Sequence, residues 1–221
     1  MAKIFECKMN NHMYDVIFST NRLIKNKTQL VRILLETIRY MMYQHDLDNP
    51  KGKIVIFVDR MSRLFFFSKE KYYSISLPMT IKKLNPVEES APKYEFELNG
   101  MKLTSELISS VIRLTDLRFE QISCAIDFAD ILDEEESRLG KDVWCVFRDL
   151  LLSEEGYVRY DKDTGAYMEA KNKQQPDLHP ENHLDICIHS KNQFKIGLKE
   201  ELSENDFIDI FNLKTDCKFL I

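Results

Sequence analysis

The sequence has few of the features that mark several classes of protein. Only 6 of its 221 residues are glycine and 6 are proline, whereas 44% are hydrophobic, so a disordered chain is excluded and a substantial core can form. The five cysteines never form a Cys-x-x-Cys pair, which argues against a disulfide framework or a zinc ribbon. No apolar run approaches the roughly 18 residues of a membrane span, and no secretion signal is recognisable. We therefore expect a cytoplasmic protein without a membrane partner.

Charge divides the chain into two parts. The segment Met1–Lys83 has 15 Lys and Arg against 7 Asp and Glu, and the remainder has 16 against 29, so the net charges are +8 and −13. A basic part suits nucleic acid or an acidic protein surface, and an acidic part suits a basic protein partner. Solvated faces alone would produce the same imbalance. We predict a basic part at 1–83 and an acidic α+β part at 93–221.

The spacing of hydrophobic residues predicts an α+β protein with an N-terminal helix and meander, central helices and a C-terminal antiparallel sheet. Apolar residues at three- and four-residue intervals indicate helices, and short β-branched or aromatic runs indicate strands. Asn99-Gly100 predicts a tight hairpin. The predicted strands are 4–8, 53–58, 63–67, 72–77, 94–98 and 101–103, and the predicted helices are 28–45, 104–116, 119–132 and 141–154, the last with Gly156 as its C-cap.

The C-terminal third predicts a sheet and a final helix. Gly165 lies between two short runs and predicts the turn of a hairpin, and Ser203 predicts the start of the helix. The acidic run at 133–136, before this region, is interpreted as a solvated face. The predicted strands are 156–161, 166–171, 183–189, 193–198 and 217–221, and the predicted helix is 203–213.

The most informative segment runs from His179 to His189 and holds three of the five histidines. From His183 onward, polar and apolar residues alternate strictly, and successive side chains on a strand point to opposite faces. The apolar residues should therefore enter the core while the polar residues form a row on the other face. The apolar members are Leu184, Ile186 and Ile188, and the polar members are His183, Asp185, Cys187 and His189.

A metal site is one interpretation of this row. Imidazole and carboxylate groups suit zinc, iron or manganese, and the available ligands are His179, His183, Asp185 and His189. The spacing matches no established zinc signature, and His183 and His189 would lie about 20 Å apart along a strand, too far to share one ion. We predict no cofactor, and a divalent metal held by His183 and Asp185 stays as the alternative.

A nuclease is the second interpretation. Asp161 with Glu169-x-Lys171 is similar to the arrangement in metal-dependent nucleases, where carboxylates hold magnesium and lysine positions or activates water. Arg159-x-Asp161 with the histidines resembles small bacterial ribonuclease toxins, in which histidine and arginine would serve acid–base catalysis and phosphate binding without metal. The candidate catalytic residues are Arg159, Asp161, Glu169, Lys171, His179, His183 and Asp185.

The third interpretation is structural, and it is the one we favour. Arg159 and Asp161 would pair with the histidine row and hold neighbouring strands, or another protein, in place. Nucleic-acid contact by the basic part stays open. Phe65–Phe67 would then stack on bases, although consecutive strand residues point to both faces and at least one of them should be core. The cations placed for phosphate contact are Arg60, Arg63, Lys69 and Lys71.

Four short runs resemble a pattern in uncharacterised bacterial proteins from mobile anti-phage or restriction loci. They cover about the last third of the chain, and they are Glu155-Gly-Tyr-Val-Arg-Tyr-Asp161, His179-Pro-x-x-His-Leu-Asp185, Phe194-Lys-Ile-Gly-Leu198 and Asp206-Phe-Ile-Asp-Ile210. The resemblance implies a context and no activity. We therefore predict a non-catalytic adaptor subunit of a bacterial multi-protein defence complex, with protein subunits as partners. The nuclease or ribonuclease toxin is the alternative.

Overall fold

The computed structural model divides the chain into two compact units. The residues it describes are 2–18, 24, 26–43, 47–85, 91–115, 140–189 and 192–218. Unit 1 consists of Met1–Asn21, Asp46–Leu77 and Glu155–Ile221, and unit 2 consists of Arg22–His45 and Pro78–Glu154. The chain thus enters unit 1 three times, whereas the predicted parts 1–83 and 93–221 follow one another in sequence.

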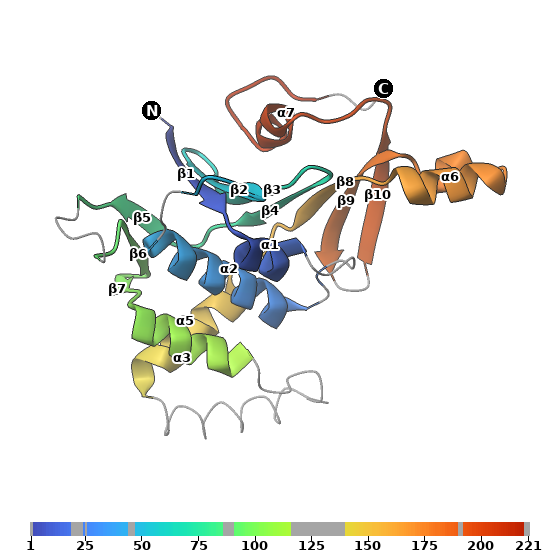
Figure 1. Cartoon of the computed structure of the whole chain (residues 1–221). Coiled ribbons are helices and arrows are strands. Elements are labelled where there is room, and N and C mark those ends of the chain that lie inside the picture. The colour runs from blue at the N-terminus through green and yellow to red at the C-terminus, as the bar shows by residue number, and fades with distance from the viewer. Residues whose placement is uncertain are drawn as a thin grey trace, which may run out of the picture. The chain divides into compact units, whose positions relative to one another are not determined.

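Unit 1 is built on a seven-stranded antiparallel sheet (Figure 1). In spatial order its strands are β1 (Lys3–Met9), β2 (Gly52–Val58), β3 (Ser62–Phe67), β4 (Lys71–Ser76), β8 (Val158–Lys162), β9 (Asn182–His189) and β10 (Asn192–Leu198). The α+β class is confirmed, as are the meander and the pairing of the histidine strand with the strand after it. β4 pairs with β8 although residues 78–154 of unit 2 separate them along the chain.

The two faces of this sheet carry different helices (Figure 1). On one face lies α7 (Glu204–Asp209), whose fully buried Phe207 meets the ring of Phe65 edge-on at 6.0 Å. On the other lies α1 (Asn11–Phe18), where the ring of Phe18 is 5.0 Å from that of Tyr73. The core on the α7 face consists of Val55, Phe57, Met61, Phe65, Phe67, Tyr72, Tyr160, Leu184 and Phe207.

Unit 2 contains three described helices and a small antiparallel sheet. Their bounds are α2 (Lys27–Met42), β5 (Thr80–Lys83), β6 (Tyr94–Leu98), β7 (Met101–Lys102), α3 (Ser105–Thr115) and α5 (Lys141–Leu152). Asn99 and Gly100 turn the β6–β7 hairpin with φ values of 49° and 84°, as the dipeptide predicts. The helix predicted at 119–132 and the acidic run at 133–136 lie outside the described residues.

The predicted hairpin at 156–171 is wrong in its second half. Residues 166–171 belong to α6 (Thr164–Asn172), which a short turn η2 (Pro176–Leu178) follows before β9. The carboxylate of Asp163 accepts a hydrogen bond from the Ala166 amide at 2.9 Å and caps the helix, and the residues behind it are good helix formers. Gly165 lies in the first turn and has no positive φ.

Three predicted ends also differ. The C-cap of α5 is Ser153 and not Gly156, which lies in the loop before β8 with a φ of 51°. Ser203 caps α7 as predicted, since its hydroxyl accepts from the Asp206 amide, but the helix ends at Asp209. Of the strand predicted at 217–221, Cys217 and Lys218 belong to no strand, and residues 219–221 lie outside the described residues. In the described part of the chain, no helix combines the length and the apolarity that crossing a membrane requires.

Candidate functional site

The pairing of β8 with β9 brings four polar side chains to one face of the sheet. Arg159 lies opposite Asp185, and Asp161 lies opposite His183. Leu184 points to the other face and is buried in the core there. The predicted alternation is therefore confirmed for residues 183–185, while the side chains of residues 187–189 are outside what the structure describes. We call Arg159, Asp161, His183 and Asp185 the Arg159 cluster.

A guanidinium nitrogen connects the two carboxylates of this cluster. Arg159 Nη2 lies 2.8 Å from Asp185 Oδ2 and also forms an ion pair with Asp161 Oδ2. His183 Nε2 faces the same two oxygens, at 3.7 Å from Asp161 and 3.8 Å from Asp185. The exposed fractions are 8% for Arg159, 4% for Asp161 and 1% for both His183 and Asp185, so the charges are removed from bulk water.

The strands on either side complete the surroundings of the Arg159 cluster. On β4, Tyr73 lies opposite Arg159, and Lys71 lies opposite Asp161. On β10, Lys195 lies opposite Asp185, with Nζ 3.9 Å from Asp185 Oδ1. We did not predict Tyr73 and Lys71 as neighbours, because the pairing of β4 with β8 crosses the insertion of unit 2 and leaves no local signal in the sequence. Three strands in addition to β8 thus contribute to one polar row.

The ring of His183 is held in one tautomer. Its Nδ1 lies 3.0 Å from the carbonyl oxygen of Pro180, which can only accept, so Nδ1 donates and Nε2 of the neutral ring carries a lone pair. Pro180 packs against Gly197, the residue opposite His183 on β10, and a Cβ at Gly197 would lie 2.8 Å from Pro180 Cγ. An isolated glycine in a strand often marks such a close approach, so Gly197 was a signal that sequence reasoning missed.

Burial and pairing act in opposite directions on the charges of the Arg159 cluster. Burial raises the pKa of Asp161 above its ordinary value, although Arg159 acts to lower it. Burial lowers the pKa of His183, and Lys195 adds to this effect, so the neutral ring is favoured. Burial acts to lower the pKa of Arg159, but attraction to Asp161 and Asp185, together with the contributions of two nearby tyrosines, outweighs it and the net shift is upward. Burial also raises the pKa of Tyr73 to about 12.

Several polar atoms of the Arg159 cluster are buried without a hydrogen bond. Within the described residues, no hydrogen bond of ordinary geometry reaches Asp161 Oδ1, Asp185 Oδ1, or Nε and Nη1 of Arg159, although Lys195 Nζ lies 3.9 Å from Asp185 Oδ1. One ligand atom from each of Asp161, His183 and Asp185 lies within 4.8 Å of the other two. This buried group could therefore hold a metal ion, and Asp161 joins the His183 and Asp185 pair of the metal alternative.

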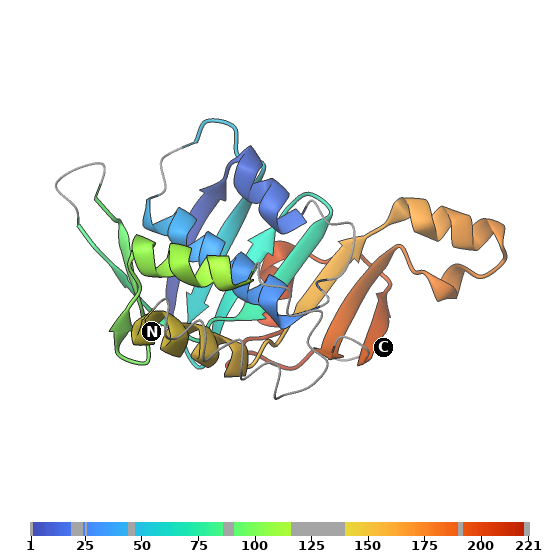
Figure 2. The same ribbon diagram turned by 90° about the horizontal axis from the view of Figure 1, so that it is seen from below.

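The other candidate catalytic residues lie outside this group. The ring of His179 stands edge-on to that of His183 at a centroid distance of 4.9 Å, and its Nδ1 is buried without a partner among the described residues. Glu169 and Lys171 are exposed on α6, which extends away from the ends of β8 and β9 (Figure 2). The Asp…Glu-x-Lys arrangement is therefore not assembled, because α6 directs both side chains to solvent while Asp161 is buried.

The proposed base-stacking platform is not present. Phe65, Phe66 and Phe67 are all fully buried, since both faces of β3 are covered. Arg63 lies over the ring of Phe211 at 4.2 Å, donates from Nε to Ser74 Oγ at 2.8 Å, and has a pKa lowered to about 10 by burial. The registers of β3 and β4 place Arg63 and Lys71 on opposite faces. Arg60 and Lys69 are exposed at turns. The four cations therefore do not form one phosphate-binding surface.

We predict that Arg159→Met destabilises the protein by about 3–5 kcal/mol at neutral pH, because two buried carboxylates lose their partner. Loss of Arg159 should raise the pKa of Asp161 further, so the folded variant keeps a proton that the unfolded chain releases near its ordinary pKa of about 4. The deficit should therefore be smallest below about pH 4 and grow as pH rises through the raised pKa. Urea unfolding across this range measures it. Arg113→Met, an exposed change, is the control, and equal deficits in both variants would contradict the prediction.

We predict that Gly197→Ala destabilises the protein by about 1–3 kcal/mol, since the new methyl group must displace Pro180. The shift should also loosen the hydrogen bond from His183 to Pro180, which NMR of the His183 ring nitrogens can detect. Gly165→Ala is the matched control, because a Cβ there meets only Asp163 at 3.7 Å, an ordinary contact, within a helix that alanine favours. A Gly197→Ala variant as stable as Gly165→Ala would contradict this account of Gly197.

Comparison of the chain with protein-family models, with curated proteins and with solved structures finds no match. The site is therefore interpreted from its own chemistry. The site contains the buried guanidinium of Arg159, which two carboxylates share, and a histidine of fixed tautomer that faces the same oxygens.

Proposed function

We propose that this chain acts by binding, as a non-catalytic adaptor subunit of a bacterial multi-protein complex. The observation that carries the proposal is the closure of the Arg159 cluster. Catalysis on a polymer needs acidic and basic groups that converge on a substrate position open to solvent. In this cluster the four side chains are buried and the charges are directed at one another. A metal ion held there would have a structural role.

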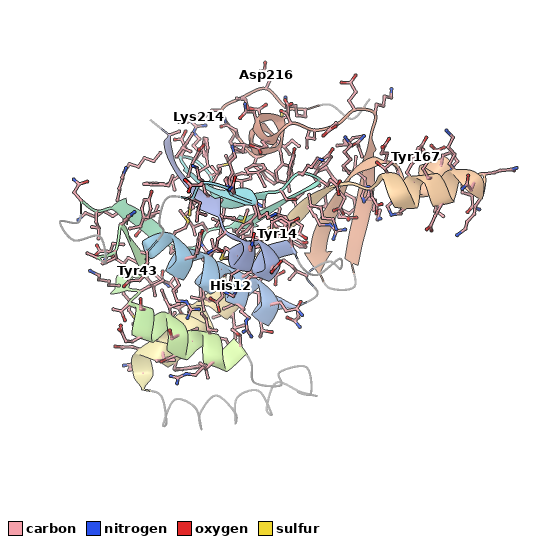
Figure 3. The ribbon with its side chains drawn as sticks, viewed as in Figure 1. His12, Tyr14, Tyr43, Tyr167, Lys214 and Asp216 are labelled. Atoms are coloured by element: carbon pink, nitrogen blue, oxygen red, sulfur yellow. The ribbon has the colours of Figure 1, made fainter. Side chains whose placement is uncertain are left out.

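A protein partner is favoured by the segment between β8 and β9. We call residues 164–178 the α6 arm. Only Ala170 of α6 is buried, whereas Met168 is 50% exposed and Leu178 is 73% exposed. Figure 3 marks the arm by Tyr167, whose ring lies 5.9 Å from Lys171 Nζ. Apolar side chains on a projecting segment with little core of its own are typical of a protein contact.

Nucleic acid is the less favoured partner. Arg63 is engaged inside unit 1, and Arg63 and Lys71 lie on opposite faces of the sheet. A phosphate-binding surface needs several cations on one side that are free to contact the backbone. The defence context implied by the sequence resemblance stays part of the proposal, with the α6 arm as the contact to another subunit.

Leu178→Asp tests the partner contact. We expect the tagged wild-type chain, expressed in its own host, to retain a stoichiometric protein partner that Leu178→Asp loses by at least about tenfold, since a charge is placed in an apolar contact. Leu152→Asp is the control, because Leu152 is 78% exposed elsewhere on the chain. If Leu178→Asp retains the partner, or if both variants lose it, the α6 arm is not the specific contact to the partner.

A nuclease assay tests the absence of catalysis. The purified chain should leave labelled single- and double-stranded RNA and DNA intact with magnesium, manganese or zinc present, because no substrate reaches the Arg159 cluster. Cleavage that disappears in a folded His183→Ala variant, and persists in the exposed-site variant His12→Ala, would overturn the proposal and establish the nuclease alternative.

A further inference from the structure

We propose that Asp161, His183 and Asp185 form a structural binding site for a divalent transition-metal ion, and that Arg159 occupies the position of this cation when the ion is absent. The three side chains come from the adjacent strands β8 and β9, which fix their spacing through the backbone pairing. His183 Nε2 lies 3.7 and 3.8 Å from the two carboxylate oxygens. Ligands of a tetrahedral ion with bonds of about 2.1 Å lie about 3.4 Å apart, so a contraction of roughly 0.4 Å would bring the two distances from His183 to this value. All three ligand atoms already lie within 4.8 Å of one another.

The histidine is prepared for coordination by its outer contact. A metal-binding imidazole usually donates its second nitrogen to a carbonyl or carboxylate, which fixes the tautomer and directs the lone pair. His183 Nδ1 makes this contact with the Pro180 carbonyl at 3.0 Å. The lone pair on Nε2 consequently faces two carboxylate oxygens, and three electron donors directed at one region call for a cation between them.

The unpartnered atoms are a second and independent observation. Asp161 and Asp185 are more than nine-tenths buried, and the Oδ1 atom of each has no hydrogen bond within the described residues. Arg159 pairs only with the Oδ2 atoms, through one nitrogen, and Lys195 Nζ lies 3.9 Å from Asp185 Oδ1, which is beyond hydrogen-bond distance. A cluster that existed only for its ion pairs would satisfy these buried atoms, since each one left unpaired is unfavourable.

The donor set selects the class of ion. One imidazole nitrogen with two carboxylates suits zinc or manganese, which accept mixed nitrogen and oxygen ligands. Magnesium prefers oxygen ligands and retains several waters, which a buried site of this kind does not offer. We therefore expect zinc and manganese to bind more tightly than magnesium, at one ion per chain.

Equilibrium dialysis with metal analysis tests the site directly. The full chain, stripped with a chelator, should take up one zinc or manganese ion. Asp185→Asn, which keeps the side-chain volume, should weaken binding by more than the roughly 10–100-fold that loss of an outer contact causes. His12→Ala, Asp177→Asn and Cys217→Ser change exposed groups that could bind metal elsewhere and should have no effect. No uptake of either ion, or equal losses in Asp185→Asn and the controls, would overturn the proposal.

Arg159→Met supplies a measurement that does not depend on the ligand variants folding. Removing the competing guanidinium should tighten metal binding by at least about tenfold, because the ion no longer has to displace a cation from the carboxylates. The metal should also restore to Arg159→Met most of the stability that the substitution removes, as a rise in Tm that the chelator reverses. Addition of Asp161→Asn to this variant should abolish the rescue. If the Arg159→Met variant binds zinc and manganese no more tightly than the wild type, and if neither ion raises its Tm, the cluster is an ion-pair network only.

Discussion

The charge balance around Arg159 is the constraint on which the centre of unit 1 depends. A buried guanidinium is tolerated only beside anions, and two buried carboxylates only beside a cation, so each requires the other. Arg159 and Asp161 come from β8, and Asp185 comes from β9. Tyr73 and Lys71 on β4 flank the same row. The row therefore joins β4 to β8 and β9, which unit 2 separates from β4 in sequence. The charges can pair only when the strands lie in this order.

The same balance connects the fold to the proposed function. The residue types of the Arg159 cluster are those of an acid–base or metal-dependent active site, yet the structure directs them inward and buries them. The surface that we propose for recognition lies instead on the α6 arm, where Leu178 and Met168 are exposed. The closed polar centre and the exposed apolar segment are the two observations behind the proposed binding role.

Local signals account for the places where sequence-based prediction succeeded and failed. Strict alternation placed His183 and Asp185 on one face and Leu184 on the other, because the period of a strand is set by the backbone itself. The same kind of reasoning made residues 166–171 a strand, since Gly165 resembles a hairpin turn. These residues form α6 instead, because the Asp163 carboxylate accepts a capping hydrogen bond from the Ala166 amide and the residues that follow are good helix formers.

The sequence by itself determined the α+β class, the meander, the Asn99-Gly100 turn and the shared face of His183 and Asp185, because these follow from periodicity and turn chemistry over a few residues. Only the tertiary structure decided that β4 lies beside β8, that Pro180 reaches His183 over Gly197, and that one arginine nitrogen serves both aspartates. Each of these features needs a contact between residues distant in sequence, namely β4 with β8, Pro180 with Gly197 and Arg159 with Asp185, and such contacts depend on which strands become neighbours.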